Sequence, residues 1–298
     1  MRRLTTVDVM LLATVLIWAF NITVTRYVLT HGFRPLAYAS IRYGVAALLF
    51  LSLTLAVEGS LSFGGRRNLL LLSIAAVTLT ANQFAFVYAL KLATGTTVAL
   101  IMGTLPVFTA LVSFAAGLER PTPRMWAAAV ITFGGVALVA LGSGGGLSSH
   151  LGGDLLALSL AATWSIYSVL IVPLMRTHSP YRISAIVLAA VWIPLTAVGA
   201  PQLANQDYGG LGWVVWVALV FAIVGPLVLT NLLWFMAVGR VGPARAALFA
   251  NLQPFVAALF AFLILSEHIK AIQIAGGAAI LAGILLERAH RPAVVPVE

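Results

Sequence analysis

The chain has 298 residues, of which 61% are hydrophobic and 8% are charged, and its formal net charge is +9. Soluble proteins keep roughly a quarter of their residues charged, so this composition excludes a water-soluble globular protein and indicates that lipid surrounds most of the chain. The sequence contains no cysteine, which excludes disulfides, thiolate metal sites and cysteine catalysis.

Ten apolar runs, separated by charged or turn residues, predict ten membrane-spanning helices. A helix needs about 20 residues to cross the hydrocarbon core, and it satisfies its own backbone hydrogen bonds there. The runs do not alternate apolar with polar residues, as the strands of a transmembrane β-barrel would. In chain order the predicted spans are 8–27, 36–57, 68–90, 94–117, 124–142, 154–175, 182–200, 211–237, 244–265 and 270–287. We therefore expect an all-α integral membrane protein.

The first span carries polar side chains along one helical face, and later spans offer similar groups. Thr14, Trp18, Asn21 and Thr25 recur at helical spacing, and polar groups in a span tend to face protein or a water-filled cavity. The residues that we expect to line a substrate cavity are Trp18, Asn21, Asn82, Phe86, Trp164, Tyr167, Asn231, Trp234 and Asn251. The alternative is that the amides hold helices together and that the tryptophans lie at the membrane interface.

Arg42 is the one charged residue well inside a predicted span, the second. It lies about six residues from the outer end of that span, which corresponds to a depth of about 9 Å. As a substrate-binding residue it would pair with a carboxylate or a phosphate. The alternative is that its long side chain extends outward to the membrane surface.

Two prolines fall inside the fourth and ninth predicted spans, Pro106 in "GTLP" and Pro254 in "NLQP". A proline inside a helix removes one backbone hydrogen bond and bends the helix. We therefore expect two helix kinks, which either take part in gating or substrate binding, or are static bends accommodated by neighbouring helices.

The chain contains an internal repeat. The matched pairs, at shifts of 146 or 148 residues, are Asp8 with Asp154, Trp18 with Trp164, Pro106 with Pro254 and Glu119 with Glu267. Chance similarity between apolar helices explains matches of Ala, Leu or Val, but not of these residue types. The predicted organisation is a five-helix repeat 1–142, a Gly/Ser-rich linker 143–153, a second repeat 154–288 and a cytoplasmic tail 289–298. Because five is odd, the second repeat is inverted, an arrangement that places substrate sites near the membrane midplane.

The basic residues predict the orientation in the membrane, because cytoplasmic loops are enriched in Lys and Arg. The residues predicted to be cytoplasmic are Arg2, Arg3, Arg66, Arg67, Arg120, Arg124, Arg176, Arg182, Arg240, Arg245, Arg288 and Arg291, and those predicted to be outside are Arg26, Arg34, Lys91 and Lys270. We expect a multi-pass protein of the cell (inner) membrane with both termini cytoplasmic. This distribution also accounts for the positive net charge without a nucleic-acid partner.

Several stretches resemble the drug/metabolite transporter superfamily, in particular its ten-helix EamA-type exporters. They include "LLATVLIWAFNITVTR" in the first span, "ASIRYGVAALLF" in the second and "NLQPFVAALFAFLILSEHIKAIQIAGGAAILAGILL" near the end. The resemblance implies export of amino acids, other metabolites or drugs. Related ten-helix families exchange sugar phosphates and nucleotide sugars and carry basic residues in their late helices, which the ninth and tenth spans lack here.

No Asp or Glu falls in the middle of a predicted span, which favours a neutral, zwitterionic or anionic substrate and argues against an intramembrane proton relay. We therefore expect a secondary transporter that exports an amino acid or a related zwitterion by alternating access, without a metal or cofactor. It is expected to be a monomer, with a dimer as the alternative. The competing hypotheses are a multidrug exporter and an integral-membrane enzyme, although the five histidines are scattered over loops and the tail and form no H-E-x-x-H motif.

Overall fold

The structure, a computed structural model, describes residues 5–115, 123–142, 151–175, 177–237, 240 and 252–288. Within these ranges the chain is helical and contains no strand. The first half forms α1 (Thr6–Thr30), α2 (Pro35–Glu58), α3 (Arg66–Leu92), α4 (Gly95–Met102), α5 (Leu105–Ala115) and α6 (Pro123–Gly142). The second half forms α8 (Leu151–Met175), α9 (Pro180–Ala204), α10 (Trp213–Ile223), the π-helical segment η1 (Val224–Leu229), α12 (Gln253–Leu265) and α13 (Ala271–Arg288).

Six of the described helical segments are long and apolar enough to cross a membrane. They are α1, α2, α3, α8, α9 and the segment Trp213–Ala237, which joins α10 and η1 to the helical residues that follow them. Shorter apolar helices cover Trp126–Val139, Phe255–Leu265 and Ala271–Gly283. The expectation of an all-helical, multi-pass membrane protein is confirmed.

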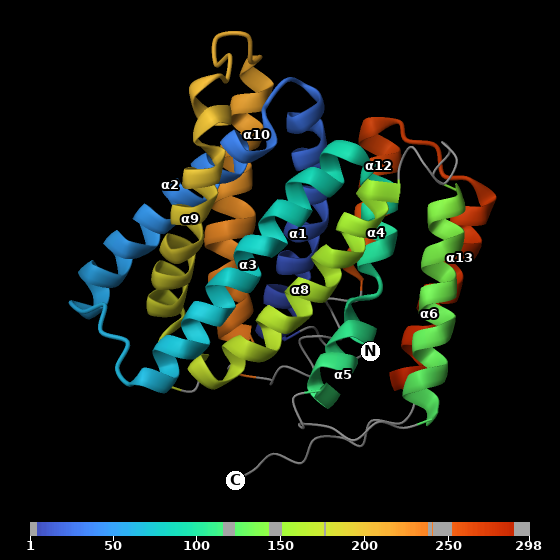
Figure 1. Ribbon diagram of the computed structural model, residues 1–298, viewed down its shortest axis with the longest axis horizontal. Helices are drawn as coiled ribbons and strands as arrows, with labels where there is room; N and C mark the ends of the chain where they lie inside the picture. The colour runs from blue at the N-terminus through green and yellow to red at the C-terminus, as the bar shows by residue number, and fades with distance from the viewer. Residues whose placement is uncertain are drawn as a thin grey trace.

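Equivalent helices of the two halves run in opposite directions (Figure 1). α1 rises in that view, whereas α8, the helix that holds its sequence counterpart, descends. α6 packs along α13 and α2 along α9, while α3 packs along α8 and the α10–η1 segment contacts α1. We call the end of the bundle that carries the α3–α4 and α12–α13 connections the Glu267 end, and the opposite end the Glu58 end.

Local sequence signals explain several helix boundaries. α1 begins with a capping box, in which the Thr5 side chain accepts from the Asp8 backbone N–H and the Asp8 carboxylate accepts from that of Thr5. α2 begins at Pro35, where a missing N–H costs nothing. It ends at Gly59, whose φ of 64° is left-handed and suits glycine. These signals fix where the two long helices enter and leave the bundle.

The predicted fourth span, 94–117, is not one continuous helix. α4 ends at Met102 and α5 begins at Leu105, with a turn between them. Pro106 is therefore the second residue of α5 and Pro254 the second residue of α12. The expectation that these prolines bend a helix from within is wrong, because N–H groups in the first turn of a helix have no intrahelical partner to lose.

The predicted linker, 143–153, overlaps the first residues of α8. α8 begins at Leu151, inside the range 143–153, and its Gly153 approaches α3 so closely that a Cβ would lie 2.9 Å from the Cβ of Ala93. The remainder of the linker, 143–150, and the tail 289–298 lie outside the described residues.

α6 and α13 approach each other through glycines. A Cβ on Gly135 would lie 2.6 Å from the carbonyl oxygen of Gly276, and a Cβ on Gly276 would lie 2.6 Å from that of Gly135. The neighbouring Gly134 has no foreign atom within 4 Å of its Cβ position. Small residues that let two backbones approach are a recurrent means of helix association in membranes, so this pair is a fixed contact between the halves.

Gly135→Ala should therefore destabilise the protein, because the added methyl group collides with backbone rather than with a flexible side chain. Gly134→Ala should leave stability unchanged or raise it, because alanine favours the helix by about 1 kcal/mol over glycine. Thermal unfolding in detergent should show a melting temperature several degrees lower for Gly135→Ala alone. Equal melting temperatures for the two variants would contradict the close packing of α6 and α13.

Candidate functional site

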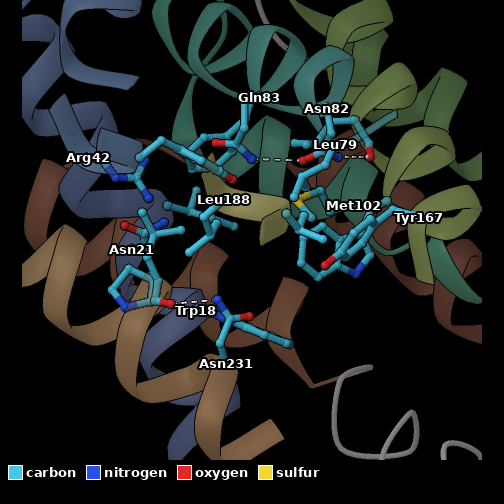
Figure 2. Close-up of a pocket in the computed structure, with 18 of the residues that line it drawn as sticks. Trp18, Asn21, Arg42, Leu79, Asn82, Gln83, Met102, Tyr167, Leu188 and Asn231 are labelled. Carbon is cyan, nitrogen blue, oxygen red and sulfur yellow. Dashed lines mark hydrogen bonds between the residues drawn. The ribbon is translucent and has the colours of Figure 1, made fainter. Parts of the chain in front are cut away.

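A cavity of about 100 Å³ lies between the two halves of the bundle and receives side chains from α1, α2, α3, α4, α5, α8, α9, η1 and α12. At roughly 10–15 Å³ for each water, it has room for several molecules of water. The predicted site residues on its wall are Trp18, Asn21, Arg42, Asn82, Phe86, Trp164, Tyr167 and Asn231. Figure 2 shows labelled members of this set converging from several helices. The sequence thus brings together residues from both repeats.

Two tryptophans from equivalent positions meet on this wall. Trp18 lies twelve residues from either end of α1 and Trp164 lies near the middle of α8. Their ring centroids are 5.8 Å apart in an edge-to-face arrangement. Trp234 packs against Trp18 at 5.1 Å but does not line the cavity, contrary to expectation. The interface-belt explanation of Trp18 is wrong, because the residue is at the middle of its helix.

The π-helical segment η1 shapes the wall opposite Trp18. Its last turn closes with the Thr230 N–H donating to the Gly225 carbonyl, five residues back. The Thr230 hydroxyl donates to the Pro226 carbonyl at 2.6 Å and accepts from Trp18 Nε1 at 2.7 Å. The Asn231 side chain donates to the Leu227 carbonyl at 2.6 Å. π-Helical turns often occur at functional sites, and the Gly-Pro pair inside this span is the sequence signal that could have indicated one.

Arg42 lies in the cavity wall and is only 2% exposed. Its Nε donates to the Ala222 carbonyl at 3.3 Å. Residue 226, four residues after Ala222, is proline and has no N–H to offer that carbonyl. The guanidinium also lies over the rings of Tyr38 and Phe86, with Cζ 4.8 and 5.8 Å from their centroids. The alternative in which Arg42 extends to the membrane surface is therefore wrong.

Amide side chains connect the helices around the cavity (Figure 2). Asn82 Nδ2 donates to the Leu160 carbonyl at 2.9 Å and to the Thr163 hydroxyl at 3.1 Å, which ties α3 to α8. Gln83 Nε2 donates to Asn82 Oδ1 at 3.0 Å. In α1, Asn21 Oδ1 accepts from the Thr25 hydroxyl at 3.4 Å. Asn82 therefore both holds helices together and lines the cavity, so the two readings of this residue do not exclude each other.

The remaining sequence expectations have mixed outcomes. Thr14 and Thr25 are buried but lie outside the cavity wall. Thr14 donates to the Met10 carbonyl and Thr25 pairs with the Tyr38 hydroxyl. Asn251 lies outside the described residues. The cavity residues that were not predicted include Ile22, Tyr43, Leu79, Met102, Leu105, Leu160, Ser184, Val187, Leu188, Pro226 and Leu227. Most of them are apolar, and no sequence pattern separates an apolar side chain that faces a cavity from one that faces lipid.

The cavity wall departs from the symmetry of the repeat at one charged position. A shift of 146 residues, the same shift that matches Trp18 with Trp164, carries Arg42 onto Leu188, which also lines the cavity. The first repeat therefore contributes a cation where the second contributes an aliphatic side chain. None of the eight acidic residues of the chain is among the described residues that line the cavity. The wall carries a positive charge on one side and aromatic rings elsewhere.

A carboxylate joins the two halves at the Glu267 end of the bundle. Glu267 accepts hydrogen bonds from the backbone N–H groups of Gly95 and Thr96 at 2.9 and 2.8 Å, at the N-terminus of α4. Arg26 Nε lies 3.9 Å from the same carboxylate, and its Nη1 donates to the Leu90 carbonyl at 2.7 Å. A residue of the second half thereby joins α4 to α1 and α3 of the first.

Comparisons with known proteins agree with this architecture. The profile of the EamA-like transporter family matches residues 5–141 and 151–287. The chain is 25% identical over 259 residues to the "Uncharacterized transporter YyaM" of Bacillus subtilis (strain 168), covering 85% of this chain and 84% of that protein. It is 27% identical over 295 residues to an "Uncharacterized transporter" of Archaeoglobus fulgidus, covering 95% and 97%. A solved structure described as "Crystal structure of protein" shares the fold, with a TM-score of 0.67, 19% identity, and coverage of 95% of this chain and 96% of that one.

The hydrogen bond between Trp18 and Thr230 should stabilise the contact between α1 and η1. Trp18→Phe and Thr230→Val should each lower the free energy of unfolding by about 1 kcal/mol, and the double variant should lose less than the sum of the two. Thermal unfolding in detergent measures this coupling. Trp213→Phe, at a position 75% exposed on α10, serves as the matched control and should have no effect. Additive losses would show that the two side chains act independently.

Proposed function

The chain belongs to the EamA-like transporter family, and from that premise we propose that it is a secondary transporter that exports a small metabolite by alternating access. The observation that carries the proposal is the cavity itself. It lies near the middle of the bundle, between halves that run in opposite directions, and its wall includes the equivalent residues Trp18 and Trp164. Inverted repeats that enclose a central site of this kind allow one site to face either side of the membrane in turn.

The proposal includes an orientation in the cell membrane. The Glu58 end carries Arg66, Arg67 and Arg182, and the positive-inside rule places it in the cytoplasm together with both termini. The Glu267 end then faces outward. Because Glu267 joins the two halves there, its hydrogen bonds to Gly95 and Thr96 must break when the cavity opens outward.

The substrate that we propose is an amino acid or a related zwitterion. Arg42 offers a positive charge to a carboxylate, and Asn21 and Asn231 offer amides. Asn82 also lines the cavity, but its N–H groups already donate to Leu160 and Thr163. The aromatic part of the wall favours a bulky or aromatic side chain. The same aromatic wall supports a second candidate function, the export of diverse hydrophobic drugs, and the response of transport to charged groups on the substrate distinguishes the two.

Purified protein in liposomes should move members of a panel of amino acids, aromatic acids and hydrophobic dyes, with and without a pH gradient. Trp18→Ala and Trp164→Ala should each reduce transport at least about tenfold, because each enlarges the central cavity and removes a large contact surface. Trp213→Ala, on the exposed face of α10, is the matched control. Wild-type rates in both cavity variants, with intact folding, would mean that the cavity is not the transport site.

Glu267→Gln should favour the outward-open state. The amide presents one N–H₂ group to a backbone N–H and so loses one of the two acceptors, together with the charge that faces Arg26. In this cysteine-free chain, Ser184→Cys places a single thiol in the cavity. A membrane-impermeant maleimide added outside should label it about tenfold faster in the Glu267→Gln background.

Glu58→Gln is the control for that experiment, because Glu58 pairs with Arg182 at 2.8 Å at the opposite end of the bundle. It should not accelerate labelling from outside. Faster labelling from the cytoplasmic side in Glu267→Gln would reverse the proposed orientation, and unchanged labelling from both sides would remove Glu267 from the closure of the cavity.

A further inference from the structure

Arg42 has one buried hydrogen-bond donor without a partner among the described residues. Its Nε is occupied by the Ala222 carbonyl, and the Tyr38 and Phe86 rings lie against its guanidinium. Nη1 is fully buried and has no hydrogen-bond partner among the described residues. A buried donor left without a partner is destabilising, and more so when it is charged, so Nη1 can gain a partner from a group that the protein itself does not provide.

The missing group is an anion. A charged side chain inside a membrane is normally paired with an opposite charge or with several carbonyls. Arg42 has one carbonyl, and no carboxylate is found among the described residues that line its cavity. The aromatic rings attract the cation through their faces, but they offer no acceptor in the plane of the guanidinium. A planar carboxylate fits the guanidinium edge geometrically as well as electrostatically.

Two helix N-termini add to the same preference. Leu105 and Gln253, the first residues of α5 and α12, both line the cavity. The positive end of each helix dipole therefore lies at the wall, where it favours negative charge. Pro106 and Pro254 therefore mark helix starts, rather than bends, beside the site.

We infer that Arg42 binds the carboxylate of the transported molecule, and that the cavity selects small organic carboxylates by this contact. The inference rests on the proposed function of the cavity as the transport site. Since Leu188 stands at the equivalent place in the second repeat, the carboxylate has one docking position on the wall rather than two. The apolar body of the ligand then lies toward Trp18, Trp164 and Tyr167. The site recognises the carboxylate of the ligand and does not require an ammonium group.

Three probes of similar size separate the two charges of an amino acid: L-phenylalanine, 3-phenylpropionate, which lacks the ammonium, and phenethylamine, which lacks the carboxylate. Binding to purified protein in detergent is followed by tryptophan fluorescence, because Trp18 and Trp164 line the cavity. Arg42→Gln should weaken both carboxylates at least about 30-fold. Arg42→Lys, which keeps the charge but not the bidentate edge, should weaken them about tenfold.

Phenethylamine provides the internal control for folding. Its affinity should be unchanged or higher in Arg42→Gln, because a like charge has been removed, whereas a damaged cavity would bind all three probes less well. Arg67→Gln, an exposed position at the start of α3, should leave every affinity unchanged. Equal losses for the amine and the acids, carboxylate binding that does not depend on Arg42, or no binding of either acid to the wild-type protein would each overturn the inference.

Transport measured in parallel separates this inference from the proposed function. Arg42-dependent binding of the two acids without movement across liposomes would support a carboxylate site and contradict the transporter. Transport of panel compounds at wild-type rates by Arg42→Gln would support the transporter and contradict the carboxylate site.

Discussion

Hydrocarbon offers no hydrogen-bond partners, so a polar side chain inside a membrane-spanning bundle must find its partner within the protein. Many hydroxyls here do so locally, as when Thr54 donates to the Phe50 carbonyl and Thr78 to the Ile74 carbonyl. The amide of Asn82 reaches across to another helix instead. Arg42 differs in that it is the charged side chain of the described cavity wall, and its buried Nη1 has no partner among the described residues.

Much of the fold could be predicted from the sequence because lipid imposes a simple rule on length and apolarity. The repeat was visible because Trp, Pro and Glu matched at nearly constant shifts. The break before Pro106 was not predicted, since a proline in an apolar run fits either a bend or a helix start. Trp18 and Asn21 could be placed on the cavity because they recur on one helical face, whereas Leu188 could not, because an apolar residue gives no sign of which surface it covers.

Features that the two repeats share differ in role from features that occur in one repeat only. The equivalent tryptophans and the glycine contacts of α6 and α13 belong to the shared scaffold. No described residue of those two helices lines the cavity, so they form a support at its side. The π-helical turn at Pro226 and the cation at Arg42 occur in one half only, and they meet through the Ala222 carbonyl. The positive charge of the cavity wall and the π-helical turn that contacts it therefore come from positions at which the two halves differ.

The Glu267 carboxylate is a single planar group whose two oxygens hold two adjacent N–H groups of α4. A rotation of that plane disturbs both bonds together, so this connection separates in one step rather than by gradual loosening. In an alternating-access carrier, such a step leaves little time in which both ends of the bundle are unsealed. In the transport cycle proposed above, the membrane would keep its ion gradients, because no continuous column of water would form through the protein.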